Sequence, residues 1–177
     1  MKEKINVSDY ADQITKAVSK GILLNTKDEK FNSMVIGWGM LGRIWNRPSY
    51  TVFVRQSRYT KEALDKSGEF TVSVPLDGVD PKIAKVCGSL SGHNIDKVKE
   101  AGLTLEEPEV NGVPGIREYP LTIECRVLYQ QDQVLADIPE DIQKQMYPQD
   151  VDSTAPMENR DIHTMYIGEI VDAYIIK

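Results

Sequence analysis

FNSMVIGWGMLGRIWNRPSYTVFVRQSRYT, residues 31–60, is the stretch around which we expect the rest of the chain to be organised. It contains both tryptophans of the protein. We expect one strand over residues 33–38 and a second over 50–55, with a glycine-rich turn between them. In the second strand, tyrosine or valine stands at every other position, which is typical of a strand with one buried face. After residue 60 the pattern changes to that of a helix.

Four polar residues at the end of this stretch form a candidate anion site, namely Arg55, Ser57, Arg58 and Thr60. A helix N-terminus offers free backbone N–H groups and a partial positive charge. Guanidinium and hydroxyl donors would add to its affinity for a phosphate. A plain helix start flanked by solvated arginines would contain the same residue types. The spacing alone therefore leaves both interpretations open.

The remaining segments mix short strands and helices without a regular βαβ order. We expect helices over 9–19, 61–67 (capped by Thr60 and ended by Gly68), 81–87 and 95–101. We expect strands over 21–24, 69–74, 121–129 and 163–176, the last broken near Gly168, a polar turn over 25–30 and an extended loop over 103–120. This pattern predicts a mainly β fold, a β-barrel with attached α-helices, in a single domain over residues 1–177.

Residues 130–161 are polar, acidic and weakly periodic. A connection of this length in a compact domain usually either covers a functional site or is mobile. Both interpretations stay open on the sequence.

The composition and the spacing of particular residues argue against several classes of function. A net charge of −6 argues against non-specific nucleic-acid binding, which needs a basic surface. No apolar run is long enough to span a bilayer, and the N-terminal residues lack the apolar region of a signal peptide. We therefore expect a cytoplasmic protein without a membrane partner. The two cysteines and two histidines are not spaced as metal ligands, so we expect no metal site.

Several motifs follow one another in a familiar order. They are Asn32-Ser-Met34, Trp38-Gly39, Trp45-Asn-Arg-Pro48, Arg55-Gln-Ser-Arg-Tyr-Thr60, Cys87-Gly-Ser-x-Ser-Gly92 with Asp96-Lys97, the LTIECRV run at 121–127, and His163-x-x-x-x-Gly168-Glu-Ile. Together they resemble the flavin reductase-like, FMN-binding split-barrel family of the flavoredoxin type. The resemblance extends over about residues 15–176.

The resemblance implies a homodimer of split β-barrels that binds FMN non-covalently near the subunit interface. It implies that the isoalloxazine edge is lined by Asn32, Ser33 and Met34, with Trp38 beside the ring system. It implies that the ribityl phosphate is surrounded by Arg55, Ser57, Arg58 and Thr60, and that the pocket is completed by Ser89, Ser91 and Lys97. His163 is a candidate catalytic residue, with a structural or interfacial role as the alternative.

Simpler interpretations apply to several of these residues. Large aromatic side chains such as Trp38 and Trp45 mostly fill cores, although Trp38 adjoins a glycine where a flat ligand could approach. The Gly88–Gly92 segment could be a plain flexible loop, because it lacks the phosphate-loop pattern. We expect Cys87 and Cys125 to be small buried hydrophobic residues.

Three functions are compatible with this sequence. The favoured one is an FMN-dependent oxidoreductase that passes electrons from NADH, NADPH or a redox partner to flavin or a small acceptor. Hydride transfer to flavin is the chemistry of the cofactor, so the lack of a catalytic triad does not argue against an enzyme. The alternatives are an FMN-binding electron carrier without a substrate site, and a related split barrel that has lost its flavin.

Overall fold

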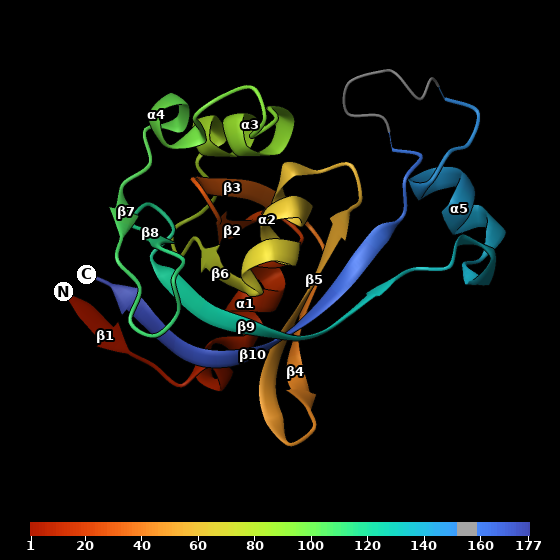
Figure 1. Ribbon diagram of the computed structural model, residues 1–177. Helices are drawn as coiled ribbons and strands as arrows, with labels where there is room; N and C mark the ends of the chain where they lie inside the picture. Colours follow the sequence, from red (N-terminus) through yellow and green to blue (C-terminus); the bar gives the residue numbers. More distant parts are fainter. Residues whose placement is uncertain (152–158) are drawn as a thin grey trace.

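The computed structural model describes residues 1–151 and 159–177 (Figure 1). The strands are β1 (Lys2–Lys4), β2 (Ile22–Lys27), β3 (Phe31–Ile36), β4 (Gly39–Ile44), β5 (Arg47–Arg55), β6 (Glu69–Val74), β7 (Leu105–Glu106), β8 (Gly115–Ile116), β9 (Leu121–Asp132) and β10 (His163–Ile176). The helices are α1 (Ala11–Val18), α2 (Tyr59–Ser67), α3 (Pro81–Ser89), α4 (Lys97–Ala101) and α5 (Glu140–Met146), with 3-10 turns η1 (Val7–Tyr10) and η2 (Leu135–Asp137).

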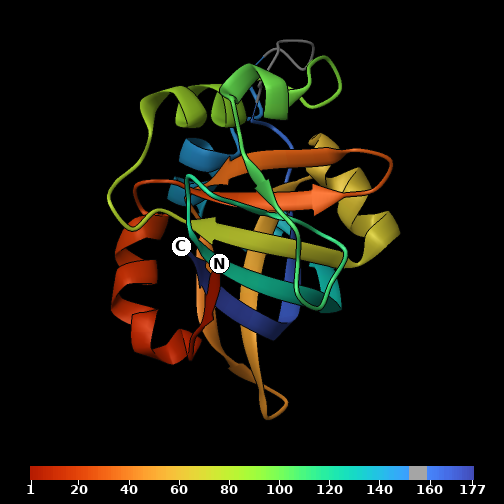
Figure 2. The ribbon, with the colours of Figure 1, turned by 90° about the vertical axis from the view of Figure 1, so that its left-hand side faces the viewer.

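One antiparallel sheet forms the body of the molecule. Among the described residues it has eight strands in the order β3-β2-β6-β9-β10-β5-β4, with β1 paired to β10. The strands curve around a common core, and α1 and α2 lie at opposite sides of it (Figure 2). The small β7–β8 pair stands apart from this sheet. The expectation of a mainly β fold with attached helices is confirmed.

The core lies on the inner face of the curved sheet. On β6, Phe70, Val72 and Val74 are fully buried and point inward together, as the alternation predicts. The pairing register places them beside the fully buried Leu121 and Ile123 of β9. Burying five such side chains contributes roughly 1.5–3 kcal/mol each before the loss of chain entropy is counted.

Strand β10 continues through Gly168, so the prediction of a break there is wrong. The register between β9 and β10 shifts at Ile167/Gly168 and again at Ile170/Asp172, so the strand bends through bulges instead of ending. A Cβ at residue 168 would collide with the Phe70 ring. Glycine is therefore needed here because the core approaches the backbone closely.

The prediction of a plain glycine-rich turn between two strands is wrong. Residues Gly39–Ile44 form β4, which pairs with β5 in a hairpin. The hairpin turns at Trp45 and Asn46, both with positive φ (49° and 59°), which is the backbone of a tight two-residue turn. Trp45 is 58% exposed, so the expectation that it packs in the core is also wrong.

Helix boundaries depend on their caps. Asp80 and Asp96 accept backbone N–H bonds at the starts of α3 and α4. Gly68 ends α2 in the left-handed conformation, as predicted (φ 64°). Thr60 is not the cap of α2: the cap position is Arg58, and Thr60 lies buried in the first turn.

A second apolar cluster fixes α3 and α4 against the outer side of β2 and β3. On β2, Leu23 points into this cluster while its neighbours Ile22 and Leu24 point into the main core. Ile83 and Cys87 of α3 are buried in the second cluster. Figure 1 shows α3 and α4 over β3, at the end of the molecule where β5 also ends.

The polar segment 130–161 begins in the sheet and then leaves it. Strand β9 extends to Asp132, and the chain then forms η2 and α5 before it returns to β10. Residues 152–158 of this segment lie outside the described residues. Among the described residues, no helix is both long and apolar enough to cross a membrane.

Candidate functional site

A cavity of about 750 Å³ lies between β3, the start of α2 and the connection from α3 to α4. The ends of β5 and β10 close one side of it. Of the eleven residues predicted to bind a cofactor, ten line this cavity, as does the candidate catalytic residue. They are Asn32, Met34, Trp38, Arg55, Ser57, Arg58, Thr60, Ser89, Ser91, Lys97 and His163. Residues far apart in the sequence are thus brought to one place by the fold.

Ser33 is the exception, since it is fully buried and does not line the cavity. Alternation along β3 places its side chain opposite those of Asn32 and Met34. Its backbone carbonyl accepts a hydrogen bond of 2.9 Å from Lys97 Nζ. The contribution of Ser33 to the site is therefore a backbone contact.

Lys97 carries a buried ammonium group in the cavity wall. The residue is only 5% exposed, and Nζ donates to the carbonyls of Ser33 and Cys87 (2.9 and 3.2 Å). No carboxylate of the described residues pairs with it. Burial lowers the pKa of Lys97 from its usual value. A buried cation with neutral partners favours a ligand with negative charge or carbonyl oxygens nearby.

The start of α2 provides the anion-binding end of the cavity. Arg58 Nη1 donates to Ser57 Oγ at 3.0 Å, and among the described side chains none caps the helix. Thr60 is tied to the cavity floor, since its Oγ1 accepts from Asn32 Nδ2 at 3.0 Å. Helix N–H groups, a guanidinium and a hydroxyl therefore meet at one end of the cavity.

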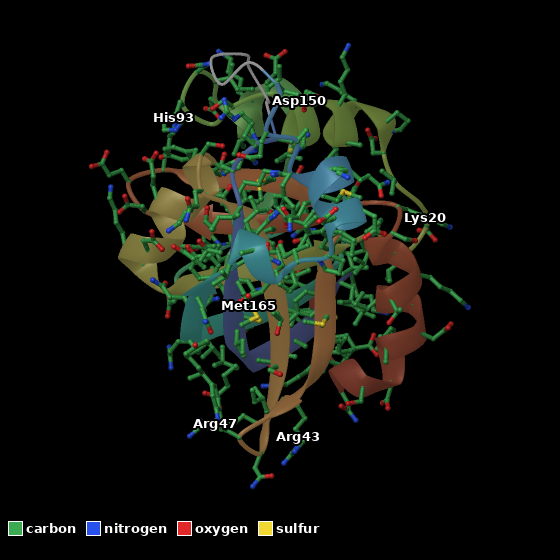
Figure 3. The ribbon with its side chains drawn as sticks, turned by 90° about the vertical axis from the view of Figure 1, so that its right-hand side faces the viewer. Lys20, Arg43, Arg47, His93, Asp150 and Met165 are labelled. Atoms are coloured by element: carbon green, nitrogen blue, oxygen red, sulfur yellow. The ribbon has the colours of Figure 1, made fainter. Side chains whose placement is uncertain are left out.

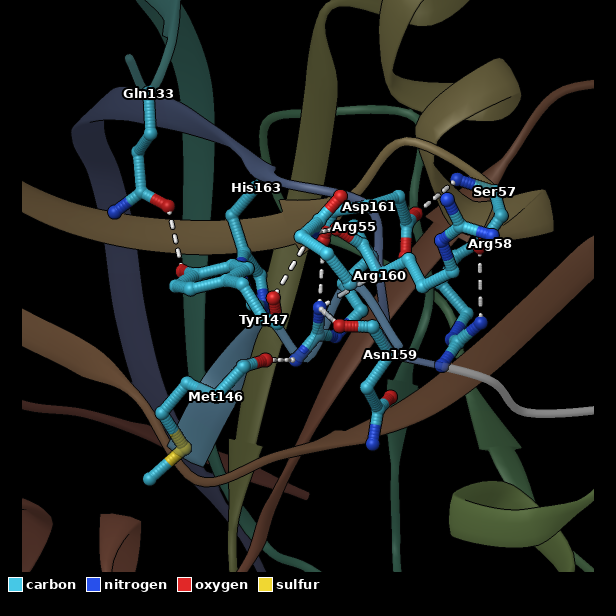
Figure 4. A network of polar contacts seen from close by, with 11 residues as sticks. Arg55, Ser57, Arg58, Gln133, Met146, Tyr147, Asn159, Arg160, Asp161 and His163 are labelled. Atoms are coloured by element: carbon cyan, nitrogen blue, oxygen red, sulfur yellow. Dashed lines mark hydrogen bonds and ion pairs between the residues drawn. The ribbon is translucent and has the colours of Figure 1, made fainter. Parts of the chain in front are cut away.

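Arg55 holds the 130–161 segment. Its guanidinium donates to the carbonyls of Met146, Asn159 and Asp161 at 2.6–3.0 Å (Figure 4). It also stacks over the Tyr147 ring, 5.1 Å from the centroid. Although Arg55 lines the cavity, the structure directs its donors to this segment.

The Gly88–Gly92 segment is held in place and is not a free loop. Ser89 is the last residue of α3, two residues beyond the predicted helix end. Lys30 Nζ donates to the Gly92 carbonyl at 2.6 Å. A Cβ at Gly92 would collide with the Asn32 amide and the Tyr59 ring, so the backbone must pass close to β3 and α2.

His163 is the first residue of β10, and one of its ring nitrogens is hydrogen-bonded within the protein. Its Nδ1 lies 2.9 Å from Tyr147 Oη, and that hydroxyl donates to Gln133 Oε1 at 2.7 Å (Figure 4). The Tyr147 hydroxyl donates its one proton to Gln133, so it can only accept a hydrogen bond from His163. A neutral His163 therefore carries its proton on Nδ1, and Nε2 is left as an acceptor. The Trp38 ring lies 4.6 Å from the imidazole, centroid to centroid.

Comparison with known proteins assigns the chain to a family. The chain matches the flavin reductase like domain over residues 16–177. It belongs to that family. Two solved flavoredoxins, from Desulfovibrio vulgaris (Miyazaki F) and Methanosarcina acetivorans, are each 26% identical to this flavin reductase-like domain. Each comparison covers 89% of this chain and 69% of the other, with TM-scores of 0.64 and 0.65.

More distant structures share the fold. A protein of Shewanella frigidimarina with a split barrel domain is 18% identical, with 98% of this chain and 76% of the other covered and a TM-score of 0.63. The family and the split-barrel fold expected from the sequence motifs are confirmed. An uncharacterized protein of Archaeoglobus fulgidus is 34% identical over 100 residues. That match spans 56% of this chain and about half of the relative (55%).

The burial of His163 predicts an acid-sensitive stability in this flavin reductase-like domain. Desolvation, with the Arg55 charge nearby, lowers the pKa of His163 to about 4. In the unfolded chain this pKa is about 6.5, so acid protonates the unfolded state first. As the pH falls from about 6.5 to 4, protonation of this residue therefore lowers the free energy of unfolding by about 3 kcal/mol.

We expect His163→Asn to remove that part of the pH dependence, because the asparagine amide can still donate to Tyr147 Oη. Urea unfolding of both proteins at pH 7 and pH 4.5 measures the difference. Equal acid sensitivity of the two proteins would contradict a neutral buried imidazole.

Several cavity residues escape prediction from the flavin reductase-like motifs. Tyr59, Asn94 and Ile95 line the cavity, and so does Cys87, which is buried as expected. Tyr59 adjoins the predicted anion site and could have been found by its position between Arg58 and Thr60. Nothing in the local sequence marks Asn94 or Ile95, because only the packing of α3 and α4 brings them to the cavity.

Proposed function

We propose that this chain is an FMN-dependent oxidoreductase. It passes electrons from NADH, NADPH or a redox partner through non-covalent FMN to flavin or a small acceptor. The observation that carries the proposal is a cavity that has cationic and hydroxyl donors at a helix start and apolar side chains elsewhere in its mixed lining. Its volume of about 750 Å³ is in the range of small-molecule sites.

The residues of the cavity fit the parts of FMN. Arg58, Ser57 and the N-terminus of α2 would hold the phosphate, since they offer a cation, a hydroxyl and backbone donors. Met34 and Trp38 supply apolar surface for a flat ring. When bound, FMN supplies the ability to accept and release a hydride or single electrons.

The chain's own residues would position the cofactor and set its surroundings. The Lys97 ammonium would place positive charge beside the ligand, which favours a more electron-rich ring. His163 is neutral near pH 7, with Nε2 as an acceptor, so it can receive a hydrogen bond without adding charge. The acidic exterior and locally basic cavity suit a small anionic ligand.

The alternative is an FMN-binding electron carrier without a substrate site. Two observations support it: the likeness to two flavoredoxins, and an acidic first turn of α5 formed by Glu140 and Asp141. An acidic surface on α5 would suit docking of a basic redox protein.

Anaerobic reduction followed by visible absorbance separates the two candidates. The FMN-loaded protein should bleach on addition of NADH or NADPH if it is an oxidoreductase with a nicotinamide donor. Bleaching by dithionite alone, with neither nucleotide effective, would support the carrier. Failure of the protein to bind added FMN would contradict both candidates, because each of them needs the cofactor.

We propose a homodimer formed through the β4–β5 hairpin, which projects from the body with Arg43 and Arg47 near its end (Figure 3). The hairpin exposes Met40 and Trp45, 54% and 58% exposed, and Trp45 meets the edge of the exposed Tyr129 ring. Exposed apolar clusters of this kind mark contact surfaces. Sedimentation equilibrium should give twice the chain mass of 20.0 kDa, and a monomer mass would contradict the proposal.

A further inference from the structure

A carboxylate of the chain itself contacts two residues that line the anion-binding end of the cavity, Ser57 and Arg55. Asp161 Oδ2 accepts a hydrogen bond of 2.8 Å from the backbone N–H of Ser57 (Figure 4). Its Oδ1 lies 3.8 Å from Arg55 Nη1 and is buried without a hydrogen-bond partner among the described residues. Ser57 and Arg55 are two of the residues that the family resemblance places around a ligand phosphate. An internal anion thus already contacts residues expected to bind an external one.

The position of Asp161 is set by the sheet. Residue His163 of β10 pairs with Arg55 of β5, and Gln56 N–H donates to the Ile162 carbonyl at 3.2 Å. This register places Asp161 directly opposite Ser57. The carboxylate is therefore held beside Ser57 by the same two strands whose ends close one side of the cavity.

The negative charge of Asp161 would compete with that of a ligand phosphate for the same positive surroundings. A phosphate monoester carries about −1.5 to −2 charge at pH 7 and needs several donors. Asp161 adds a negative charge at this end and engages the Ser57 N–H. Arg58, whose hydrogen bond is to Ser57 Oγ, contributes the opposing positive charge. Like charges a few ångströms apart in a partly buried site repel substantially.

We propose that Asp161 is a specificity-determining residue that sets how strongly the site prefers phosphorylated over unphosphorylated flavin. It does so by competing with the ligand phosphate for the Ser57 N–H and by opposing its charge. The inference rests on the proposed function, because it takes FMN as the ligand. Riboflavin, which is FMN without the phosphate, does not meet this competition.

Asp161→Asn tests the effect of the opposing charge with little disturbance of the fold. The amide oxygen can still accept the Ser57 N–H, while the negative charge is removed. Asp132→Asn is the matched control. Asp132 also makes side-chain hydrogen bonds near the start of β10, to Gln56 and Thr164. Neither of these partners lines the cavity, whereas both partners of Asp161 do. Thermal melts of both variants check that they fold.

The experiment measures dissociation constants for FMN and riboflavin by flavin fluorescence, using the unaltered chain and both variants. We expect Asp161→Asn to tighten FMN binding roughly tenfold, which corresponds to about 1.4 kcal/mol, and to leave riboflavin binding unchanged. We expect Asp132→Asn to change neither. Unchanged or weaker FMN binding by Asp161→Asn, or an equal gain for riboflavin, would overturn the inference.

Inorganic phosphate provides a readout that does not need flavin. Millimolar phosphate should raise the melting temperature of Asp161→Asn more than that of the unaltered protein, because ligands that bind the folded state stabilise it. If the unaltered protein binds neither flavin, the proposed function fails. If it binds flavin, yet Asp161→Asn shows neither effect, only the role of Asp161 fails.

Discussion

Replacing Arg58 with alanine is expected to weaken FMN binding by about 1.5–3 kcal/mol, the range for a hydrogen bond to a charged group. Arg58 lines the cavity at the start of α2, and its guanidinium donates to the neighbouring Ser57 hydroxyl. No carboxylate of the described residues forms an ion pair with it, so a ligand phosphate would be its first anionic partner. The melting temperature of the flavin-free protein should barely change. Fluorescence titration with FMN and riboflavin measures the effect.

Lys61→Ala is the matched control for Arg58→Ala. Lys61 stands on the same helix, but its Nζ pairs with Asp65 at 2.6 Å and the residue does not line the cavity. We expect this variant to retain FMN, and both variants to bind riboflavin as the unaltered protein does. Full FMN affinity in Arg58→Ala would remove this residue from the phosphate site.

Glu124→Ala is expected to destabilise the fold by about 3–5 kcal/mol. The side chain is fully buried on β9, and its carboxylate accepts three backbone N–H groups, from Glu109, Val110 and Asn111, at 2.6–2.8 Å. Hydrogen bonds to a charged group contribute about 1.5–3 kcal/mol each, and alanine would leave these donors without a partner. Urea denaturation gives the change in the free energy of unfolding.

The control for Glu124 is Glu69→Ala. Glu69 lies at the start of β6, and its carboxylate accepts one backbone N–H, from Gly112 at 2.8 Å. Its side chain is 25% exposed, so water can replace part of that interaction. A loss of about 1 kcal/mol is expected there. Similar losses in the two variants would mean that the buried carboxylate does not anchor the loop before β8.

Some elements of the fold could be predicted because their local signals agree. Strand 69–74 alternates cleanly and coincides with β6, and Gly68 marks the end of α2. Strand β4 was missed because Gly39, Gly42 and Arg43 interrupt the apolar alternation that identifies a strand. Its hairpin turn at Trp45-Asn46 also lacks the usual glycine. Pairing with β5 across the sheet, which local sequence does not encode, makes this segment a strand.

Site residues that form a contiguous motif could be predicted from the sequence. Contacts that depend on the register of the sheet could not. The 55–60 stretch could be named as a candidate because hydroxyls and guanidiniums gather at a helix start, and its residues Arg55, Ser57, Arg58 and Thr60 line the cavity. The partners of Arg55 could not be predicted from the sequence, because Met146 and Asp161 follow it by 91 and 106 residues. Tyr147, which fixes the tautomer of His163, lies in the segment with the weakest periodicity. Such contacts depend on β5 lying beside β10.

The most direct test of the central claim is a fluorescence titration of the flavin-free protein with FMN. The cavity and its anion-binding end predict saturable binding of one FMN per chain, with weaker binding of riboflavin. Absence of saturable binding by either flavin would contradict the account and leave a split-barrel fold whose cavity serves another ligand.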